Sequence, residues 1–427
     1  MKKKKRLLKL FLFIIIFPLW STSYLFLSAF HKDESFYFGK RRLQILSQLS
    51  PKEGLLIFSG GFETKKEVEI YPFRQESNFF YLTGVHQKKS ALLLYWHGQF
   101  PMEILFVTTP PSWLEKWIGS FLKPGYEGSK KTGILEVKSF SQLKSTLQNL
   151  KSSHPTLYTN AQEMNPSFYS YLEKSRWNLK NSSPLLLRQR LVKDSLELQK
   201  IQKAVDITTA AHFRAMKKLR PYLWEYQLQA EVEYVFLYNG AKRPAFTSII
   251  GSGKNSCILH YNQNQKKMLP GELVVVDIGA EYDRYAADLT RTLPVSGRFT
   301  QRQKEIYQIV LDAQKAALQE VKPGSNIRRV HMAARKFIEK NGYGAYFPHG
   351  TSHWMGLDVH DPCPYHVPFK PGMVLTVEPG IYLSKEKFGI RIEDDVLVTK
   401  TGYKLLSRRL PKEIRQIEQI MKKGWKK

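Results

Sequence analysis

Short apolar runs alternate with amphipathic stretches over residues 40–180. The runs at 55–59, 91–95 and 104–108 predict strands, because each is a brief apolar segment between polar or turn-forming residues. Apolar residues three and four positions apart predict a helix over 139–150. This alternation indicates a small α/β domain at 40–180.

A second, longer domain is expected after the linker-like sequence at 181–184, which combines Asn, Ser and Pro. We assign it residues 188–420, where helical and strand patterns alternate again. Helices are predicted over 194–219, 226–239 and 301–321, and strands over 273–279, 286–293, 374–378 and 389–398. The whole chain is therefore predicted to be of mixed α/β (α+β) class.

The N-terminus has the pattern of an export signal. Residues 2–6 are all Lys or Arg, and residues 10–30 carry no charge. A basic segment before an apolar one is typical of a secretory signal, and about 20 apolar residues also suffice to span a bilayer. We therefore expect residues 1–30 to be a signal peptide or signal anchor, with membrane association through residues 7–30. The expected location is membrane-anchored or exported, and a cytoplasmic location is the alternative.

Composition removes several classes of protein. Of the 427 residues, 42% are hydrophobic, which excludes a disordered chain. The net charge of +29 favours contact with anionic surfaces, but no helix-turn-helix, zinc-finger or RNA-recognition pattern accompanies it, so we expect no specific nucleic-acid partner. The two cysteines, Cys257 and Cys363, cannot form a disulfide framework or a zinc site by themselves.

Acidic residues interrupt two pairs of predicted strands. Asp277 lies in an otherwise apolar strand, and Asp288 lies in the next one. A hairpin that turns at their sequence midpoint, between Tyr282 and Asp283, would place the two opposite each other. Their Cβ atoms would then be about 4.5–5.5 Å apart. Two buried carboxylates so close repel each other, and a divalent cation between them would remove that repulsion.

The same arrangement occurs a second time. Glu378 ends one predicted strand and Glu393 lies in the next, and their midpoint falls near Lys385 in a polar loop. A second hairpin would place these two glutamates opposite each other. Four acids in apolar strands require a shared partner, because isolated buried charges are costly.

A nitrogen ligand is expected in the segment that contains His349, His353 and His360. Three histidines within twelve residues, bracketed by glycines, indicate a site rather than packing. Carboxylates with one imidazole form a hard, oxygen-rich donor set, which favours Mn²⁺ or a similar ion over a thiolate-type zinc site. Bridging carboxylates can hold two ions about 3.5–4 Å apart with an activated water between them. The metalloprotease H-E-x-x-H, the phosphate-binding loop and the G-x-S-x-G elbow are absent from the sequence.

These motifs resemble the pita-bread metallopeptidases, in particular the aminopeptidase P family. The similarity is carried by residues 251–261, the Asp277 and Asp288 segment, and residues 349–361, 371–380 and 389–395. Residues 71–84 are also similar to that family's N-terminal domain signature. The sequence departs from the family pattern at 362–370, where the loop is short and lacks a clear basic substrate-side residue, and at 117–128.

The resemblance implies a fold and a reaction. It implies a small N-terminal α/β domain followed by a pita-bread (creatinase/aminopeptidase-like) catalytic domain. The implied activity is that of a metal-dependent exopeptidase, which releases the N-terminal residue from peptides with proline in second position through a hydroxide that bridges the metals. A prolidase acting on Xaa-Pro dipeptides is one alternative. A metal-free pseudoenzyme that binds peptides or acidic partners is another, and a homo-oligomer is left open.

The resemblance also assigns roles to residues. Two divalent ions, usually Mn²⁺, would be held by a set of five ligands: Asp277, Asp288, His353, Glu378 and Glu393. Asp288 and Glu393 would bridge the ions, and Glu378 would also transfer a proton. His260 and His360 would flank the scissile carbonyl as catalytic residues. Substrate-side or supporting positions fall to His349, Arg391 and Tyr261.

Overall fold

The computed structural model describes residues 34–61 and 73–424. By its internal contacts the chain divides into two compact units, and the boundary lies between Ser182 and Ser183. The predicted signal or anchor at residues 1–30 lies outside the described residues. Within the described ranges, no helix combines the length and the apolar character needed to cross a membrane.

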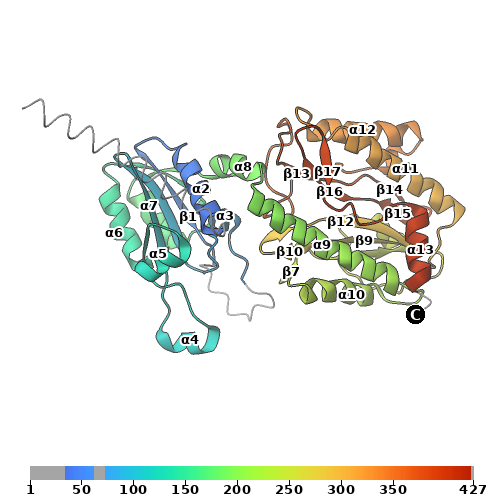
Figure 1. Ribbon diagram of the computed structural model, residues 1–427, viewed down its shortest axis with the longest axis horizontal. Coiled ribbons are helices and arrows are strands. Elements are labelled where there is room, and N and C mark those ends of the chain that lie inside the picture. The colour runs from blue at the N-terminus through green and yellow to red at the C-terminus, as the bar shows by residue number, and fades with distance from the viewer. Residues whose placement is uncertain (1–33, 62–72, 425–427) are drawn as a thin grey trace, which may run out of the picture. The chain divides into compact units, whose positions relative to one another are not determined.

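The N-terminal unit is built on a six-stranded sheet in the order β4-β3-β2-β1-β5-β6. Figure 1 shows this unit, with β1 labelled among its helices. Its strands are β1 (Glu53–Phe58), β2 (Ala91–His97), β3 (Phe100–Val107), β4 (Glu136–Ser139), β5 (Thr156–Thr159) and β6 (Asn178–Asn181). Its helices are α2 (Glu34–Leu46), α3 (Ser77–Thr83), α4 (Ser112–Ile118), α5 (Tyr126–Thr132), α6 (Leu143–Leu150) and α7 (Pro166–Lys174). The three strands predicted in this unit are confirmed as β1, β2 and β3.

The predicted helix over 139–150 begins later than expected. Residues Phe140–Gln142 form a 3₁₀ turn, and α6 follows from Leu143. The hydroxyl of Ser139 accepts the backbone N–H of Ser141, which caps this turn. Leu143, Leu147 and Leu150 are buried in the core of the unit, as their spacing requires.

The C-terminal unit contains longer helices and several small sheets. Its helices are α8 (Ser183–Leu191), α9 (Ser195–Lys218), α10 (Glu225–Tyr238), α11 (Gln301–Gln319), α12 (Ile327–Lys340) and α13 (Ile414–Gly424). Its strands are β7 (Arg243–Pro244), β8 (Ile249–Ser252), β9 (Leu273–Ile278), β10 (Ala280–Tyr282), β11 (Tyr285–Ala286), β12 (Leu289–Pro294), β13 (Val374–Val377), β14 (Gly380–Leu383), β15 (Phe388–Arg391), β16 (Asp394–Val398) and β17 (Tyr403–Leu405).

Two helix pairs cover the strands of this unit. Helix α9 begins where predicted, because Asp194 and Glu197 cap each other's backbone N–H groups. It packs against α10 and against β10, β11 and β12. Helix α11 packs against α12 and against β13, β14 and β15 (Figure 1). Each helix pair therefore supports one of the strand groups that carry the predicted acids.

The first acidic hairpin has a different register from the one expected. Thr290, not Asp288, is the residue opposite Asp277. The turn lies at Asp283 and Arg284, whose φ angles are 46° and 76°, one residue later than predicted. Positive φ at both central residues is the geometry of a two-residue hairpin turn that follows the twist of its strands. Asp288 is therefore a diagonal neighbour of Asp277 on the same face, and this spacing still lets carboxylates meet.

The second hairpin has the expected register. Val377 lies opposite Asp394, and Gly380 lies opposite Arg391. The same register continued between these pairs places Glu378 opposite Glu393, which confirms that prediction.

The predicted strands over 286–293 and 389–398 are both interrupted. The first is broken before β12, at Asp288, and the second is broken before β16, at Glu393. At each break a backbone N–H donates a hydrogen bond to the other hairpin. The N–H of Asp288 donates to Asp395 Oδ2 at 3.0 Å, and the N–H of Glu393 donates to the carbonyl of Thr290 at 3.1 Å. The two hairpins are thus joined where their acids lie.

Candidate metal centre

The residues predicted as ligands converge in the C-terminal unit. Their ligand atoms lie within 4.8 Å of one another in three overlapping groups: Asp277 with Asp288 and Glu393; His353 with Glu378 and Glu393; and Asp288 with His353 and His360. Together these groups contain all five predicted ligands and His360 in addition. The arrangement therefore offers four carboxylates and two imidazoles to a shared space.

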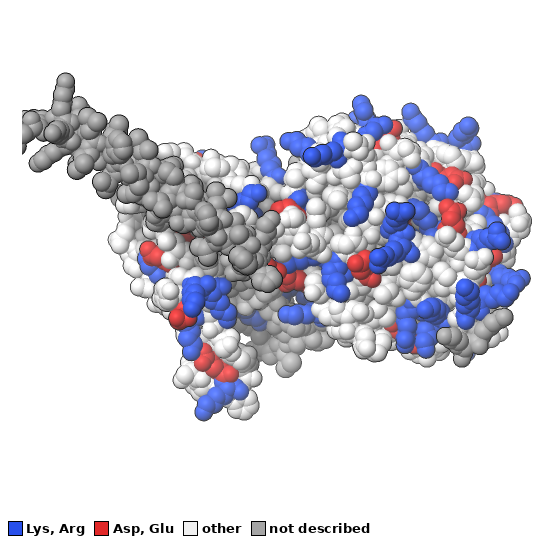
Figure 2. Space-filling view, in the orientation of Figure 1, with Lys and Arg blue, Asp and Glu red and all other residues white. Residues whose placement is uncertain are grey.

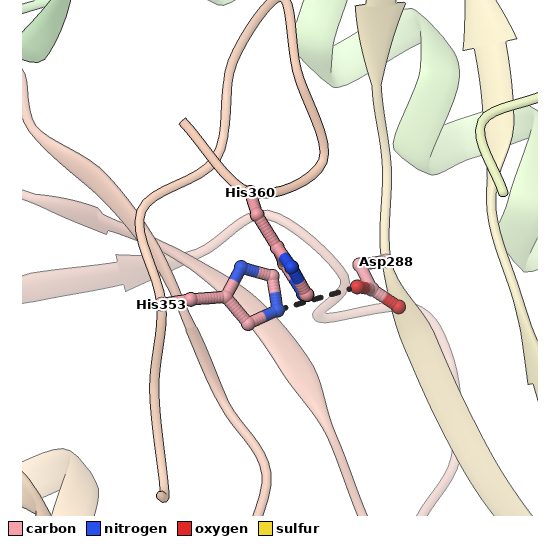
Figure 3. A group of neighbouring side chains, drawn as sticks. All are labelled: Asp288, His353 and His360. Atoms are coloured by element: carbon pink, nitrogen blue, oxygen red, sulfur yellow. Dashed lines mark ion pairs between the residues drawn. The ribbon is translucent and has the colours of Figure 1, made fainter. Parts of the chain in front are cut away.

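The two hairpins carry the acids, and a separate loop carries the imidazole of His353. The backbone of His353 is held by β13, because its N–H donates to Thr376 Oγ1 at 3.2 Å and its carbonyl accepts the N–H of Thr376 at 3.0 Å. Figure 3 shows the His353 ring beside Asp288, with the ring of His360 next to it. His353 Nε2 lies 3.4 Å from Asp288 Oδ2 and 3.7 Å from Glu378 Oε1.

The carboxylates are strongly perturbed by their surroundings. Burial raises the pKa of Glu378 to about 7, and the charges of Asp288 and Asp277 act in the same direction. Burial, followed by repulsion from Asp277, raises the pKa of Asp288 well above its ordinary value. Burial and repulsion from Asp288 do the same to the pKa of Glu393. Bound cations would reverse these shifts, since nearby positive charge favours the ionised carboxylate.

The individual donor atoms fit divalent cations. The Nδ1 of His353 lies 3.2 Å from the carbonyl of Trp354, which assigns the proton to Nδ1 and leaves the lone pair of Nε2 facing the acids. Asp277 Oδ1 is buried and has no hydrogen-bond partner among the described residues. A buried oxygen without a partner is costly unless a ligand satisfies it, so we infer that the site is built for metal.

A network of hydrogen bonds links Asp277 to Arg391, Tyr382 and His349. Arg391 Nη2 donates to Asp277 Oδ2 at 2.5 Å, and its Nη1 donates to the hydroxyl of Tyr382 at 2.8 Å. That hydroxyl lies 2.9 Å from His349 Nε2, while His349 Nδ1 lies 2.7 Å from the carbonyl of Gly350. Burial and the charge of Arg391 lower the pKa of His349 to about 4, so this histidine is neutral and accepts from Tyr382.

Two participants in this network were not predicted from the sequence. Tyr382 joins Arg391 to His349, and the hydroxyl of Thr290 donates to Glu393 Oε2 at 2.6 Å. Thr290 could have been found from the correct hairpin register, because it lies opposite Asp277. Tyr382 carries no comparable signal, since an aromatic residue in a strand is ordinary.

The other predicted site residues, His360, His260 and Tyr261, differ in how far they are exposed to solvent. His360 is exposed, and its ring lies 4.1 Å from the ring of His353, nearly perpendicular to it. Partial burial, with His353 and His260 nearby, lowers the pKa of His360 to about 4. His260 is also exposed. Tyr261 is buried instead, and its hydroxyl donates to Glu225 Oε2 at 2.7 Å, so it anchors the segment that carries His260.

Known proteins share this architecture over most of its length. Residues 199–400 match the model of metallopeptidase family M24, and residues 38–158 match the N-terminal domain of aminopeptidase P. The Xaa-Pro aminopeptidase of Haemophilus influenzae is 34% identical over 418 residues, which cover 90% of this chain and 96% of that protein. The chain belongs to metallopeptidase family M24. As a member of this family it is a metallopeptidase with a site for two divalent metal ions.

A solved structure and a further relative are also similar to this chain. The structure of Escherichia coli aminopeptidase P with the inhibitor Pro-Leu has a TM-score of 0.86 at 33% identity, and the match covers 93% of this chain and 100% of that one. The two-domain pita-bread fold implied by the sequence motifs is thereby confirmed. A Xaa-Pro dipeptidase of Pyrococcus furiosus is 37% identical, but it matches only 66% of this chain and 82% of its own length.

Proposed function

We propose that this M24 chain is a metal-dependent aminopeptidase that releases the first residue from peptides with proline in second position. The observation that carries the proposal is the convergence of four carboxylates and an imidazole in a chain that matches aminopeptidase P relatives over both of its domains.

The proposed ligands are Asp277, Asp288, His353, Glu378 and Glu393. The site is oxygen-rich, and such donor sets favour hard ions, so we propose Mn²⁺ as the metal. Two bound ions would supply an activated water and polarise the peptide carbonyl. Arg391 would hold Asp277 in place through the hydrogen bond described above, and Thr290 would hold Glu393.

Glu378 is the proposed proton carrier. Its Oε1 and Oε2 lie 3.7 and 4.0 Å from the imidazoles of His353 and His349, so it is positioned by nitrogen atoms rather than locked by a strong hydrogen bond. A carboxylate with this freedom would accept a proton from the attacking water and pass it on. The nitrogen of proline in a peptide carries no hydrogen, so it must receive a proton to leave as an amine, and Glu378 would supply that proton.

His260 and His360 are the proposed donors to the carbonyl oxygen of the substrate. With its pKa lowered to about 4, His360 is neutral at neutral pH and carries one N–H group. An N–H group directed at an oxygen that gains negative charge lowers the barrier without a change in protonation. The exposure of both histidines keeps them within reach of a bound peptide.

An assay with Xaa-Pro-Yaa tripeptides, with and without chelator, tests the proposal. We expect release of the first residue, loss of activity on chelation, recovery with Mn²⁺, and little cleavage of a matched Xaa-Ala-Yaa peptide. Metal analysis of the purified protein should find about two ions per chain, as a dinuclear site requires. Absence of hydrolysis together with less than half an ion per chain would favour the pseudoenzyme.

Prolidase activity is the second candidate. It is favoured by the similarity to a Xaa-Pro dipeptidase over the catalytic unit. The match of residues 38–158 to the aminopeptidase P N-terminal domain supports the first candidate instead. Cleavage of Xaa-Pro dipeptides without cleavage of Xaa-Pro-Yaa would decide for prolidase.

We also propose that residues 1–30 direct the protein to a membrane or out of the cell, on the strength of their sequence pattern alone. N-terminal sequencing of the protein from membrane and soluble fractions tests this. An intact N-terminus found only in the soluble fraction would contradict it.

A further inference from the structure

The loop that carries His360 is closed around a single carboxylate. The N–H of Asp361 donates to the carbonyl of Trp354 at 2.9 Å, and Asp361 Oδ1 accepts the N–H of Asp358 at 3.1 Å. The N–H of Gly356 donates to the carbonyl of Asp358 at 3.0 Å. His360 is therefore held between two aspartates that are fixed to each other.

Two buried cations hold this loop from outside the hairpins. Arg190, near the end of α8, is 2% exposed, and its Nη2 donates to Asp358 Oδ2 at 2.7 Å and to Asp361 Oδ1 at 2.6 Å. Lys193 Nζ, also buried, lies 3.3 Å from Asp361 Oδ2. We call Arg190, Lys193, Asp358 and Asp361 the loop clamp. The clamp joins a segment near residue 190 to a loop about 170 residues later in the chain.

The loop packs closely against the loop clamp at Gly356. A Cβ atom at Gly356 would lie 2.5 Å from Asp361 Oδ2 and 3.1 Å from Lys193 Cε. The same glycine accepts the N–H of Ala286 at 2.9 Å, which ties the loop to the first acidic hairpin. The clamp thus fixes the loop relative to the strands that deliver the acids.

Stability alone does not account for such a cluster. Buried ion pairs are often no more stabilising than apolar residues of similar volume, although removal of one partner is costly. A better attested role of buried ion pairs is to hold the groups around them in a single conformation. A catalytic group misplaced by about 1 Å can cost about 100-fold in rate, and His360 lies next to Asp361 in the clamp.

We propose that Arg190 is a positioning residue that acts on the reaction through His360, an inference that rests on the proposed function. Arg190 belongs to none of the groups whose atoms could hold a metal ion. A single guanidinium nitrogen of Arg190, Nη2, donates to both aspartates that flank His360, so one long side chain fixes the residues on either side of that histidine.

A double-mutant cycle tests this proposal. Arg190→Gln and Arg190→Lys should lower kcat on an Xaa-Pro-Yaa peptide about 10- to 100-fold, while metal content stays at the level of the unaltered protein. His360→Ala should lower kcat as well, and adding Arg190→Gln to it should cause less than a twofold further loss. A full additional loss in the His360→Ala background, or unchanged kcat in Arg190→Gln alone, would overturn the proposal.

A second variant and a second readout cover the case in which Arg190→Gln fails to fold. Gly356→Ala should displace Asp361 and reproduce the loss of kcat. In chelated protein, the ring resonances of His360 should shift or broaden in Arg190→Lys and Gly356→Ala, while those of His154 in the N-terminal unit stay unchanged. Unaltered His360 resonances in both variants would contradict the proposal without any activity measurement.

A matched control separates positioning from general loss of a buried arginine. Arg42 in the N-terminal unit is 1% exposed and pairs with Glu103 at 2.9 Å. Arg42→Gln should lower stability but leave kcat and KM of the remaining folded protein unchanged. If the unaltered protein cleaves no Xaa-Pro peptide, the proposed function fails; if it does and the cycle is additive, only the role of Arg190 fails.

Discussion

At the scale of single residues, the acids of the site differ in how firmly each is held. Asp277 accepts from Arg391, and Glu393 accepts from Thr290. The Glu378 side chain has imidazole neighbours at 3.7 and 4.0 Å instead. A hydrogen bond donated to a carboxylate favours its charged form, although burial and repulsion from Asp288 still raise the pKa of Glu393 well above its ordinary value. We propose that this difference divides two roles between the glutamates: Glu393 would hold metal, and Glu378 would also move protons.

Substitution of Glu378 by glutamine tests that division. The amide keeps an oxygen for a metal ion but cannot carry a proton, so turnover should fall about 10²- to 10⁴-fold with only a modest loss of bound metal. Steady-state kinetics and metal analysis of Glu378→Gln check this. Glu386→Gln, at an exposed glutamate paired with Arg302, is the matched control and should leave kcat unchanged. Normal turnover in Glu378→Gln would remove this residue from the mechanism.

His212 makes stability depend on pH through a group outside the proposed ligand set. Its Nε2 donates to the carbonyl of Leu289 at 3.0 Å, and its Nδ1 is buried without a partner among the described residues. Burial and the charge of Arg291 lower its pKa from 6.5 to about 3. Above pH 6.5 the ring is neutral in both states. As the pH falls from 6.5 toward 3, the unfolded chain binds a proton that the native protein refuses, so stability is lost.

The expected loss between pH 6.5 and 4 is about 3 kcal/mol, at about 1.4 kcal/mol per unit of pKa difference. His212→Gln removes this term. Urea unfolding of both chelated proteins at pH 8 and pH 4 measures it, because the stability advantage of the unaltered protein over the variant should shrink by about that amount at pH 4. An advantage that stays constant across this range would contradict the assignment.

At the scale of elements, the sequence predicted which strands carry acids but misplaced one turn. Glu378 and Glu393 lie opposite each other because their polar loop is symmetric about its midpoint. The same midpoint argument failed for Asp277 and Asp288. The tight turn at Asp283 and Arg284 falls one residue later than expected, which moves the partner of Asp277 by two residues, from Asp288 to Thr290. Periodicity along a strand does not encode where a two-residue turn falls.

Local sequence patterns could not predict the contacts between elements that lie far apart in the sequence. The 194–219 helix was predictable because its capping residues and apolar spacing are local. The pairing of Arg190 with Asp358 and the bond between Tyr382 and His349 join segments far apart in sequence, and neither has a local signature. The resemblance of motifs suggested the ligands that we propose, whereas only the fold showed the groups that contact them.

Gly279 tests how closely the arms of the first hairpin must approach. A Cβ atom there would lie 1.8 Å from the carbonyl oxygen of Ala287 and 2.8 Å from Phe246, so Gly279→Ala must part the strands next to Asp277 and Asp288. We expect metal affinity to fall about 10- to 100-fold, as for other changes around ligands. Titration of the chelated protein with Mn²⁺ measures this loss.

The matched control for this substitution is Gly402→Ala. A Cβ atom at Gly402 meets nothing within 4 Å, so this variant should bind metal like the unaltered protein. Equal affinities in the two glycine variants would show that the ligands tolerate separation of the hairpin arms.

At the scale of the whole molecule, charge is distributed very unevenly between surface and interior. The net charge is +29, and Figure 2 shows Lys and Arg side chains spread over the viewed face of the C-terminal unit with fewer acids among them. The interior of that unit holds the opposite excess, since Asp277, Asp288, Glu393 and Asp395 are all buried. Folding without metal therefore gathers acids against their mutual repulsion.

Metal binding should accordingly raise the stability of the protein. An ion that binds only the native state adds about 2.7 kcal/mol at a free concentration 100 times its Kd. For a unit of roughly 240 residues this corresponds to a rise in Tm of roughly 5–11 °C. Calorimetry of the chelated protein before and after addition of Mn²⁺ measures the rise. Asp288→Asn, which removes one buried acid of the site, should begin with less repulsion and gain much less from Mn²⁺. If that variant gained as much as the unaltered protein, the stabilising ions would have to bind elsewhere, and the link between the buried acids and the stability of the fold would be lost.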